Sequence, residues 1–187
     1  FLNEVKCLFR RSLTENFRTP TLALAKFSQK IFIGLFMGFL YFQTSQRSSF
    51  EVSAANITGV IFVFVCEFTY SALYSVISFL PTSYPLLVRE YHNGLYRVSS
   101  FYIGKALAFL PLFSLDGVIM LLIAYWMIGL ANSGFHFFYA LLIGVLIEQT
   151  STSFGLMLSA ASPSFPVAIS IAGPLVTLLS LTGGLYA

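Results

Sequence analysis

The chain has 187 residues, of which 57% are hydrophobic and 9% are charged, and its formal net charge is +3. In a soluble domain about a quarter of the residues are charged, and a domain of this length still leaves roughly a third of its unfolded surface in water. Because so much apolar surface cannot be hidden in a soluble core of this size, the composition predicts a membrane protein. The small net charge and the scattered basic residues exclude a nucleic-acid-binding surface.

The first elements are an amphipathic helix and two membrane spans. Residues 1–19 alternate apolar and basic side chains at helical spacing, which is typical of a helix lying at a membrane surface. Apolar stretches at 21–44 and 55–80 are each long enough to cross a bilayer. Within the first span, the spacing of Gly34 and Gly38 predicts the close approach of another helix.

The second half of the chain contains a polar loop and three further spans. Residues 84–100 form the most polar internal stretch, and Asn93-Gly94 predicts a turn within it. Spans are expected at 101–129, with a kink at Pro111, at 135–160 and at 167–187, the last interrupted at Gly173-Pro174. We therefore expect an all-α membrane protein, and the apolar run at its end suggests a fragment of a longer chain.

The basic residues predict how the spans are oriented. One side of the predicted topology carries Lys6, Arg10, Arg11, Arg18, Lys26, Lys30, Arg89, Arg97 and Lys105, whereas the other side carries Arg47. Because lysine and arginine accumulate on the cytosolic side of membrane proteins, we expect a cytosolic N-terminus and a cytosolic 84–100 loop. The sequence does not distinguish the plasma membrane from an organelle or vesicle membrane.

Three carboxylates lie within the predicted spans and are the first candidates for function. They are Glu67, Asp116 and Glu148. A charge at the centre of a membrane helix costs about 2.5 to 3.5 kcal/mol on insertion scales, so such residues face other helices or a wet cavity. One interpretation is a polar lining for a substrate path, and the other is a protonated or hydrogen-bonded packing group. Glu67 is the strongest candidate, and the polar residues after Glu148 could satisfy that carboxylate locally.

No catalytic or metal site is expected from the sequence. The chain contains a single aspartate, whereas an intramembrane aspartyl protease needs two. It has no HExxH motif, and the two cysteines, Cys7 and Cys66, are expected at different depths, so neither zinc binding nor a disulfide is predicted.

The stretch REYHNGLYRVSSFYIGKALAFLP, residues 89–111, resembles the transmembrane domain of G-subfamily (White/Scarlet-type) ABC half-transporters. Further likeness lies in NEVKCLFRRSLTENFRTPT, in AYWMIGL at 124–130, in STSFGLMLSAAS at 151–162 and in the terminal GGLYA. The resemblance implies an ABC-2 type (type V exporter-like) domain over 1–187, with 1–19 as connecting helix and five of six membrane spans present.

The resemblance also implies parts that lie outside this sequence. An ATP-hydrolysing nucleotide-binding domain with ATP and Mg²⁺ would precede the chain, a second half-transporter would form a homo- or heterodimer with it, and membrane lipids would surround it. No GxxxxGK[ST] phosphate loop occurs in these residues. The 84–100 loop would couple the two domains through Arg89, Glu90, Tyr91, Gly94, Tyr96 and Arg97.

In the family, the substrate cavity lies between the second and fifth spans of the two halves. Matched by position, the cavity would involve Phe64, Glu67, Phe68, Ser71, Tyr74, Gly173, Thr177 and Ser180, and Leu185 and Tyr186 would close it outward. The carboxylate of Glu67 and the hydroxyl of Ser71 replace uncharged polar and aromatic residues of multidrug-type members. These differences favour a small, polar or cationic substrate.

The leading hypothesis is an ATP-driven transporter of a small organic or lipid-like substrate, for which the White/Scarlet likeness suggests pigment precursors such as tryptophan derivatives or guanine. Two alternatives stay open. One is a sterol, lipid or xenobiotic exporter of the same family, and the other is a membrane channel or scaffold that uses no ATP.

Overall fold

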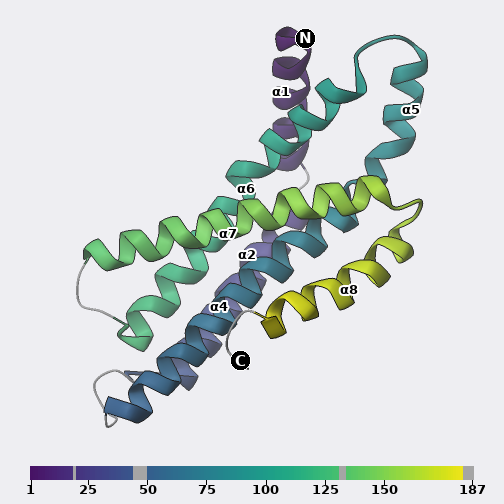
Figure 1. Cartoon of the computed structure of the whole chain (residues 1–187). Helices are drawn as coiled ribbons and strands as arrows, with labels where there is room; N and C mark the ends of the chain where they lie inside the picture. Colours follow the sequence, from purple (N-terminus) through teal and green to yellow (C-terminus); the bar gives the residue numbers. More distant parts are fainter. Residues whose placement is uncertain (19, 44–49, 131–133, 183–187) are drawn as a thin grey trace.

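The computed structural model describes residues 1–18, 20–43, 50–130 and 134–182, and its described part is a helical bundle without strands (Figure 1). The elements, in chain order, are α1 Leu2–Arg18, α2 Pro20–Leu40, α4 Phe50–Phe79, the short 3₁₀ turn η1 Pro81–Ser83, α5 Tyr84–His92, α6 Val98–Ile128, α7 Gly134–Ala161 and α8 Phe165–Thr182. Among the described residues, five helices are long and apolar enough to cross a membrane. The all-α membrane architecture expected from composition is therefore confirmed.

Two elements lie at one end of the bundle. Figure 1 shows α1 and α5 near this end, whereas the start of α4 and the C-terminal end of α6 lie at the opposite end. The chain changes direction after α5 at Gly94, whose φ of 69° is a left-handed conformation that glycine adopts without strain. Gly129 ends α6 in the same way, with φ of 72°.

The core forms where α6 packs against α2 and α7, and where α4 packs against α7. One cluster of buried side chains joins α2, α4 and α6 around Met37, Val60, Met120 and Ala124. A second cluster joins α4, α7 and α8 around Leu73, Leu158 and Ala172. In contrast, α8 leaves most of its large apolar side chains exposed, including Leu178, Leu179 and Leu181.

The predicted close approach at Gly34 and Gly38 is confirmed. A Cβ atom at Gly34 would lie 3.3 Å from the carbonyl oxygen of Met120, and one at Gly38 would lie 2.7 Å from the sulfur of Met127. Both contacts are with α6, so these two glycines allow α2 to reach that helix.

Three of the prolines, Pro81, Pro111 and Pro174, affect their helices in different ways. Pro81 follows the end of α4 and starts η1, as expected for a helix-breaking residue. Pro111 and Pro174 lie inside α6 and α8. The predicted interruption at Gly173-Pro174 is wrong, because α8 continues through it: membrane helices tolerate proline when neighbouring groups compensate for the missing hydrogen bond.

Candidate functional site

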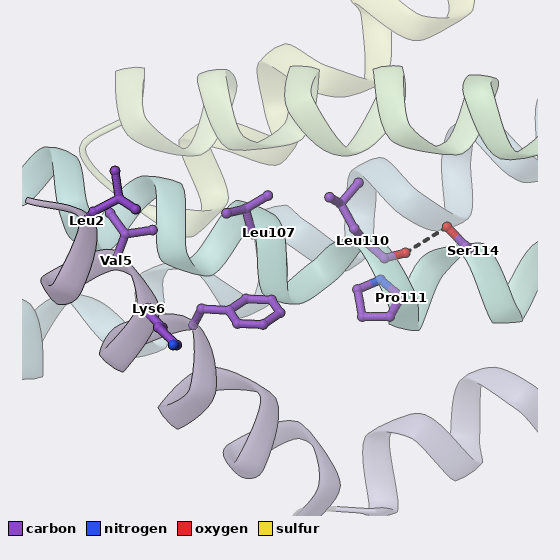
Figure 2. A pocket seen from close by; sticks show the side chains of 8 residues that line it. Leu2, Val5, Lys6, Leu107, Leu110, Pro111 and Ser114 are labelled. Atoms are coloured by element: carbon purple, nitrogen blue, oxygen red, sulfur yellow. Dashed lines mark hydrogen bonds between the residues drawn. The ribbon is translucent and has the colours of Figure 1, made fainter.

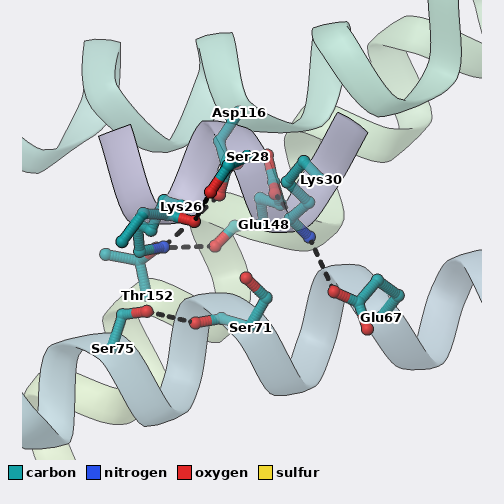
Figure 3. A network of polar contacts seen from close by, with 10 residues as sticks. Lys26, Ser28, Lys30, Glu67, Ser71, Ser75, Asp116, Glu148 and Thr152 are labelled. Carbon is teal, nitrogen blue, oxygen red and sulfur yellow. Dashed lines mark hydrogen bonds and ion pairs between the residues drawn. The ribbon is translucent and has the colours of Figure 1, made fainter. Parts of the chain in front are cut away.

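Two lysines of α2 meet three carboxylates from three other helices in the interior of the bundle. Figure 3 shows Lys26 and Lys30 directed from α2 toward Asp116 on α6, Glu148 on α7 and Glu67 on α4. We call these five residues the buried charge cluster. The lysines are four residues apart, one helical turn, so both lie on the same face of α2.

The first pair of the cluster is fully enclosed. Lys26 Nζ lies 3.3 Å from Asp116 Oδ2, and the two side chains are 6% and 1% exposed. The same ammonium lies 4.0 Å from the centroid of the Phe113 ring, which adds a cation–π contact. This geometry is that of a structural ion pair between α2 and α6.

The second lysine has two carboxylates within reach. Lys30 Nζ lies 3.3 Å from Glu67 Oε1 and 4.0 Å from Glu148 Oε1. The Lys30 and Glu148 side chains have no exposed surface, whereas that of Glu67 is 19% exposed. Glu67 is therefore the member of the cluster that a molecule outside this chain can reach most easily.

The Glu148 carboxylate is held tightly against α6. A Cβ atom at Gly117 would lie 2.8 Å from Glu148 Cδ, so only glycine leaves room for the carboxylate there. Within the described part of the chain, neither carboxylate oxygen of Glu148 has a hydrogen-bond partner. The following polar residues do not satisfy it: the hydroxyl of Thr152 donates to the backbone carbonyl of Glu148 instead.

Three of the predicted cavity residues, Tyr74, Gly173 and Ser180, lie where α4 and α8 approach each other. The Tyr70 and Ser180 hydroxyls are 3.4 Å apart, and a Cβ atom at Gly173 would lie 3.8 Å from the Tyr74 hydroxyl. Glu67, Ser71 and Tyr74 follow one another at spacings of four and three residues, so they share a face of α4. The Thr177 hydroxyl donates to the Pro174 carbonyl of its own helix.

Phe64 and Phe68 lie one helical turn apart on α4. Both are buried in the cluster that joins α2, α4 and α6, and they line a pocket of about 220 Å³ with Leu121, Tyr125 and Gly144. Their role in a substrate cavity stays a prediction. Leu185 and Tyr186, the predicted outer plug, lie outside the described residues.

The predicted coupling residues lie on and after α5, where α5 meets α1. Arg11 Nη1 lies 3.0 Å from both oxygens of Glu90, so the two helices are joined by an ion pair. The Tyr96 hydroxyl donates to Glu90 Oε2 over 2.7 Å. Burial and this hydrogen bond raise the pKa of Tyr96 to about 12, so the hydroxyl keeps its proton at neutral pH. Arg89, Tyr91, Gly94 and Arg97 are exposed at the same end of the molecule.

Further contacts join α1 to the start of α6. Glu4 Oε2 accepts hydrogen bonds from the Ser100 hydroxyl at 2.8 Å and the Arg97 backbone N–H at 3.4 Å. These two bonds, the Ser100 bond first, lower the pKa of Glu4. Glu15 pairs with Lys105 at 3.0 Å. Together with the Arg11 pair, these bonds fix α1 against two segments that are distant in sequence.

An open apolar groove of about 810 Å³ separates the beginning of α1 from α6 (Figure 2). Val5 and Phe9 line one wall, and Leu107 and Pro111 line the other. Lys6 is its charged lining residue. The amphipathic α1 thus contacts α6 through Leu8, while part of its apolar face is left open.

Comparison with known proteins identifies the family. Residues 3–187 match the family model described as ABC-2 type transporter. The chain belongs to the ABC-2 type transporter family. It is 37% identical over its full length to the ABC transporter ATP-binding protein/permease wht-3 of Caenorhabditis elegans. It is also 32% identical to Protein scarlet over 95% of its length and 31% identical to Protein white over 98%, both from Drosophila melanogaster.

The resemblance to White/Scarlet-type half-transporters is therefore confirmed. The chain spans 30% of the length of the wht-3 protein and 26% of that of the scarlet and white proteins. The matched family model and the apolar helices identify this chain as a membrane domain of the family.

In this ABC-2 type domain, the burial of two lysines in the charge cluster was not predicted from the sequence. From the sequence, Lys26 and Lys30 count only as basic residues near the cytosolic end of the first span, whereas in the structure both are buried against carboxylates of other helices. A signal was present, because two lysines one turn apart inside an apolar stretch require partners, and three carboxylates of other spans could supply them.

Proposed function

We propose that this chain is the membrane half of an ATP-driven transporter that dimerises with another half-transporter and moves a small organic substrate across a membrane. The observation that carries this proposal is the attachment of α1 to α5 by the Arg11–Glu90 pair. A transporter needs a contact of this kind between its parts, because the ATPase unit lies outside the membrane and the substrate path lies within it. The relative wht-3 is itself described as an ATP-binding protein and permease.

In the proposed mechanism, ATP and Mg²⁺ are held by a nucleotide-binding domain outside this sequence. Closure of two such domains displaces α1 and α5 together, because Arg11 and Glu90 join them. The displacement reaches α6 through the Glu4–Ser100 and Glu15–Lys105 contacts. Because α6 carries Asp116 in the buried charge cluster, the movement extends to the helices that line the substrate path.

The proposed substrate path lies along α4 and α8, at the interface with the second half-transporter. Glu67, Ser71, Tyr74, Gly173, Thr177 and Ser180 are proposed to face it, and Leu185 and Tyr186 to close it outward. A carboxylate and several hydroxyls favour a small polar or cationic substrate over a sterol. Tryptophan derivatives and guanine are proposed first, and lipids or xenobiotics are the alternative cargo.

Transport by the full-length protein tests this proposal. The protein, co-expressed with a half-transporter partner, is reconstituted in vesicles and supplied with ATP and Mg²⁺ or with a non-hydrolysable ATP analogue. We expect accumulation of tryptophan derivatives or guanine only with hydrolysable ATP. Accumulation of cholesterol alone would instead support the lipid-exporter alternative, and equal flux with and without ATP would indicate a channel.

A further inference from the structure

We propose that Lys30 is an exchangeable counter-ion and that Glu67 is the binding site for a protonated amine. In this arrangement the amine of the ligand takes the place of Lys30 on Glu67, and the Lys30 ammonium moves onto Glu148. The proposal rests on the proposed function, since the ligand approaches along the α4 and α8 face. Among the small organic substrates proposed above, it favours those that carry a protonated amine.

The position of the Lys30 ammonium allows such an exchange. It lies 3.3 Å from Glu67 Oε1 and 4.0 Å from Glu148 Oε1, so both carboxylates are within ion-pair distance of a single Nζ atom. A lysine ammonium sits on a flexible four-carbon stem and can change partners by small rotations. Lys30 can therefore leave Glu67 without losing an anionic partner.

Glu148 can accept the Lys30 ammonium as a closer ion-pair partner. Its carboxylate is fully buried, and both of its oxygens lack a hydrogen-bond partner among the described residues. Burying such a group without partners costs free energy. A closer contact between Glu148 and the Lys30 ammonium would recover part of this cost and so offset the loss of the Glu67 pair.

The charges of the cluster also favour an added cation. Lys26 is committed to Asp116 at 3.3 Å in an enclosed pair. This leaves one ammonium, Lys30, for two carboxylates, Glu67 and Glu148. A ligand with one positive charge gives each ionised carboxylate its own cation, whereas an anionic ligand brings a partner to neither of them.

The surroundings of Glu67 suit an amine that carries an aromatic ring. Glu67 is the partly exposed member of the cluster. One and two turns further along α4, the rings of Tyr70 and Tyr74 are stacked with centroids 6.1 Å apart and planes inclined by 6°. Aromatic faces pack against rings and attract cations. A ring beside these tyrosines would place a short alkylammonium group near the carboxylate.

Binding of phenethylamine tests the exchange. The full-length protein with its half-transporter partner is placed in lipid nanodiscs without ATP, and equilibrium binding of radiolabelled phenethylamine is measured. N-acetylphenethylamine, which has no charge, reports binding that does not depend on the ion pair. We expect Glu67→Gln to weaken phenethylamine binding by about tenfold or more, within the range of measured site couplings, and to leave the neutral analogue unaffected.

Two variants separate the exchange from a simple attraction to Glu67. Glu148→Gln should weaken phenethylamine binding by roughly tenfold, because the displaced Lys30 ammonium then has no anionic partner. Thr152→Val, which removes a buried hydroxyl one turn further along α7, is the matched control and should bind as the wild type does. The double variant Lys30→Met/Glu148→Gln should bind phenethylamine at least as tightly as the wild type, because no ammonium competes for Glu67.

Wild-type affinity in Glu148→Gln would overturn the proposal, as would a wild type that binds no phenethylamine. A double variant that folds but binds no better than Glu148→Gln would do the same. If the double variant fails to fold, the comparison of Glu148→Gln with Thr152→Val decides. ATP-driven uptake of tryptophan derivatives and guanine is measured on the same variants. If the wild type shows no uptake, the transport function is contradicted. The binding data still decide whether the ion-pair exchange occurs.

Discussion

Lys26 and Asp116 form an ion pair in an enclosed part of the bundle, where their side chains are 6% and 1% exposed. In such surroundings the attraction within the pair is offset by the cost of removing both charges from water. The pair therefore adds little net stability, but each charge depends on the other. Removing one partner leaves a buried charge with no compensation.

We predict that Lys26→Met destabilises the protein by about 3 to 5 kcal/mol, as is typical when one member of a buried ion pair is lost. The double variant Lys26→Met/Asp116→Leu should recover most of the loss, because it replaces both charges with apolar groups. Thermal unfolding of the purified full-length protein in detergent measures both effects.

Lys105→Met provides the control for that experiment. Lys105 pairs with Glu15, whose side chain is 55% exposed, and pairs of this kind contribute about 0.2 to 1 kcal/mol. Its unfolding temperature should stay close to that of the wild type. A Lys26→Met protein as stable as Lys105→Met would show that Asp116 is neutral or solvated in the folded protein.

At the scale of elements, α1 and α5 are joined by a pair that is too exposed to contribute much stability. Arg11 is 48% exposed and Glu90 is 13% exposed, so loss of the pair should change the free energy of unfolding by about 1 kcal/mol or less. The pair is important for a different reason. It connects α1, at the start of the chain, to α5, which follows α4, so a movement of one helix is passed to the other.

We predict that Arg11→Ala lowers ATP-driven transport severalfold while ATP hydrolysis and the unfolding temperature change little. The charge-swapped variant Arg11→Glu/Glu90→Arg should restore part of the transport. Transport and ATPase rates are measured on the same reconstituted full-length protein. A parallel fall of ATPase rate, transport and unfolding temperature would mean that the pair serves folding and not coupling.

The elements themselves were predictable from the sequence, and their side-chain partners were not. Long apolar stretches show where helices can cross a membrane, and the glycines at 34 and 38 showed where one helix can approach another. Hydropathy does not say which face of a helix meets which neighbour. For this reason Lys26 and Lys30 were interpreted as orientation signals, although they are buried against carboxylates from three other helices.

The predicted substrate cavity also shows that a sequence does not specify which side chains of a helix are buried. The family resemblance predicts Phe64, Glu67 and Phe68 together in the cavity. Phe64 is three residues before Glu67 and Phe68 follows it directly, so the three lie at adjoining positions around α4 and differ in burial. Glu67 is on the partly exposed side, whereas the two phenylalanines are in the core. The contacts of each face depend on how α4 packs against α6, α7 and α8, which a single sequence does not specify.

At the scale of the whole molecule, the bundle has two different ends. The end with α1 and α5 carries most of the exposed basic side chains, among them Arg10, Arg89 and Arg97. The loss of Lys26 and Lys30 as orientation signals does not reverse this bias. Because arginine and lysine mark the cytosolic side, we predict that this end is cytosolic.

Cysteine labelling in microsomes, whose outer face is cytosolic, tests that orientation. α7 has 28 residues, so at 1.5 Å per residue it is about 42 Å long and exceeds the roughly 30 Å hydrocarbon core. Its two ends should therefore lie on opposite sides of the membrane.

The labelling uses full-length variants that each contain one cysteine. We expect a membrane-impermeant maleimide to label Cys7 at once in one variant and Ser164→Cys at once in another. Gly134→Cys should react only after the membrane is dissolved. Immediate labelling of both Gly134→Cys and Ser164→Cys would show that α7 does not cross, and immediate labelling of Gly134→Cys alone would reverse the orientation.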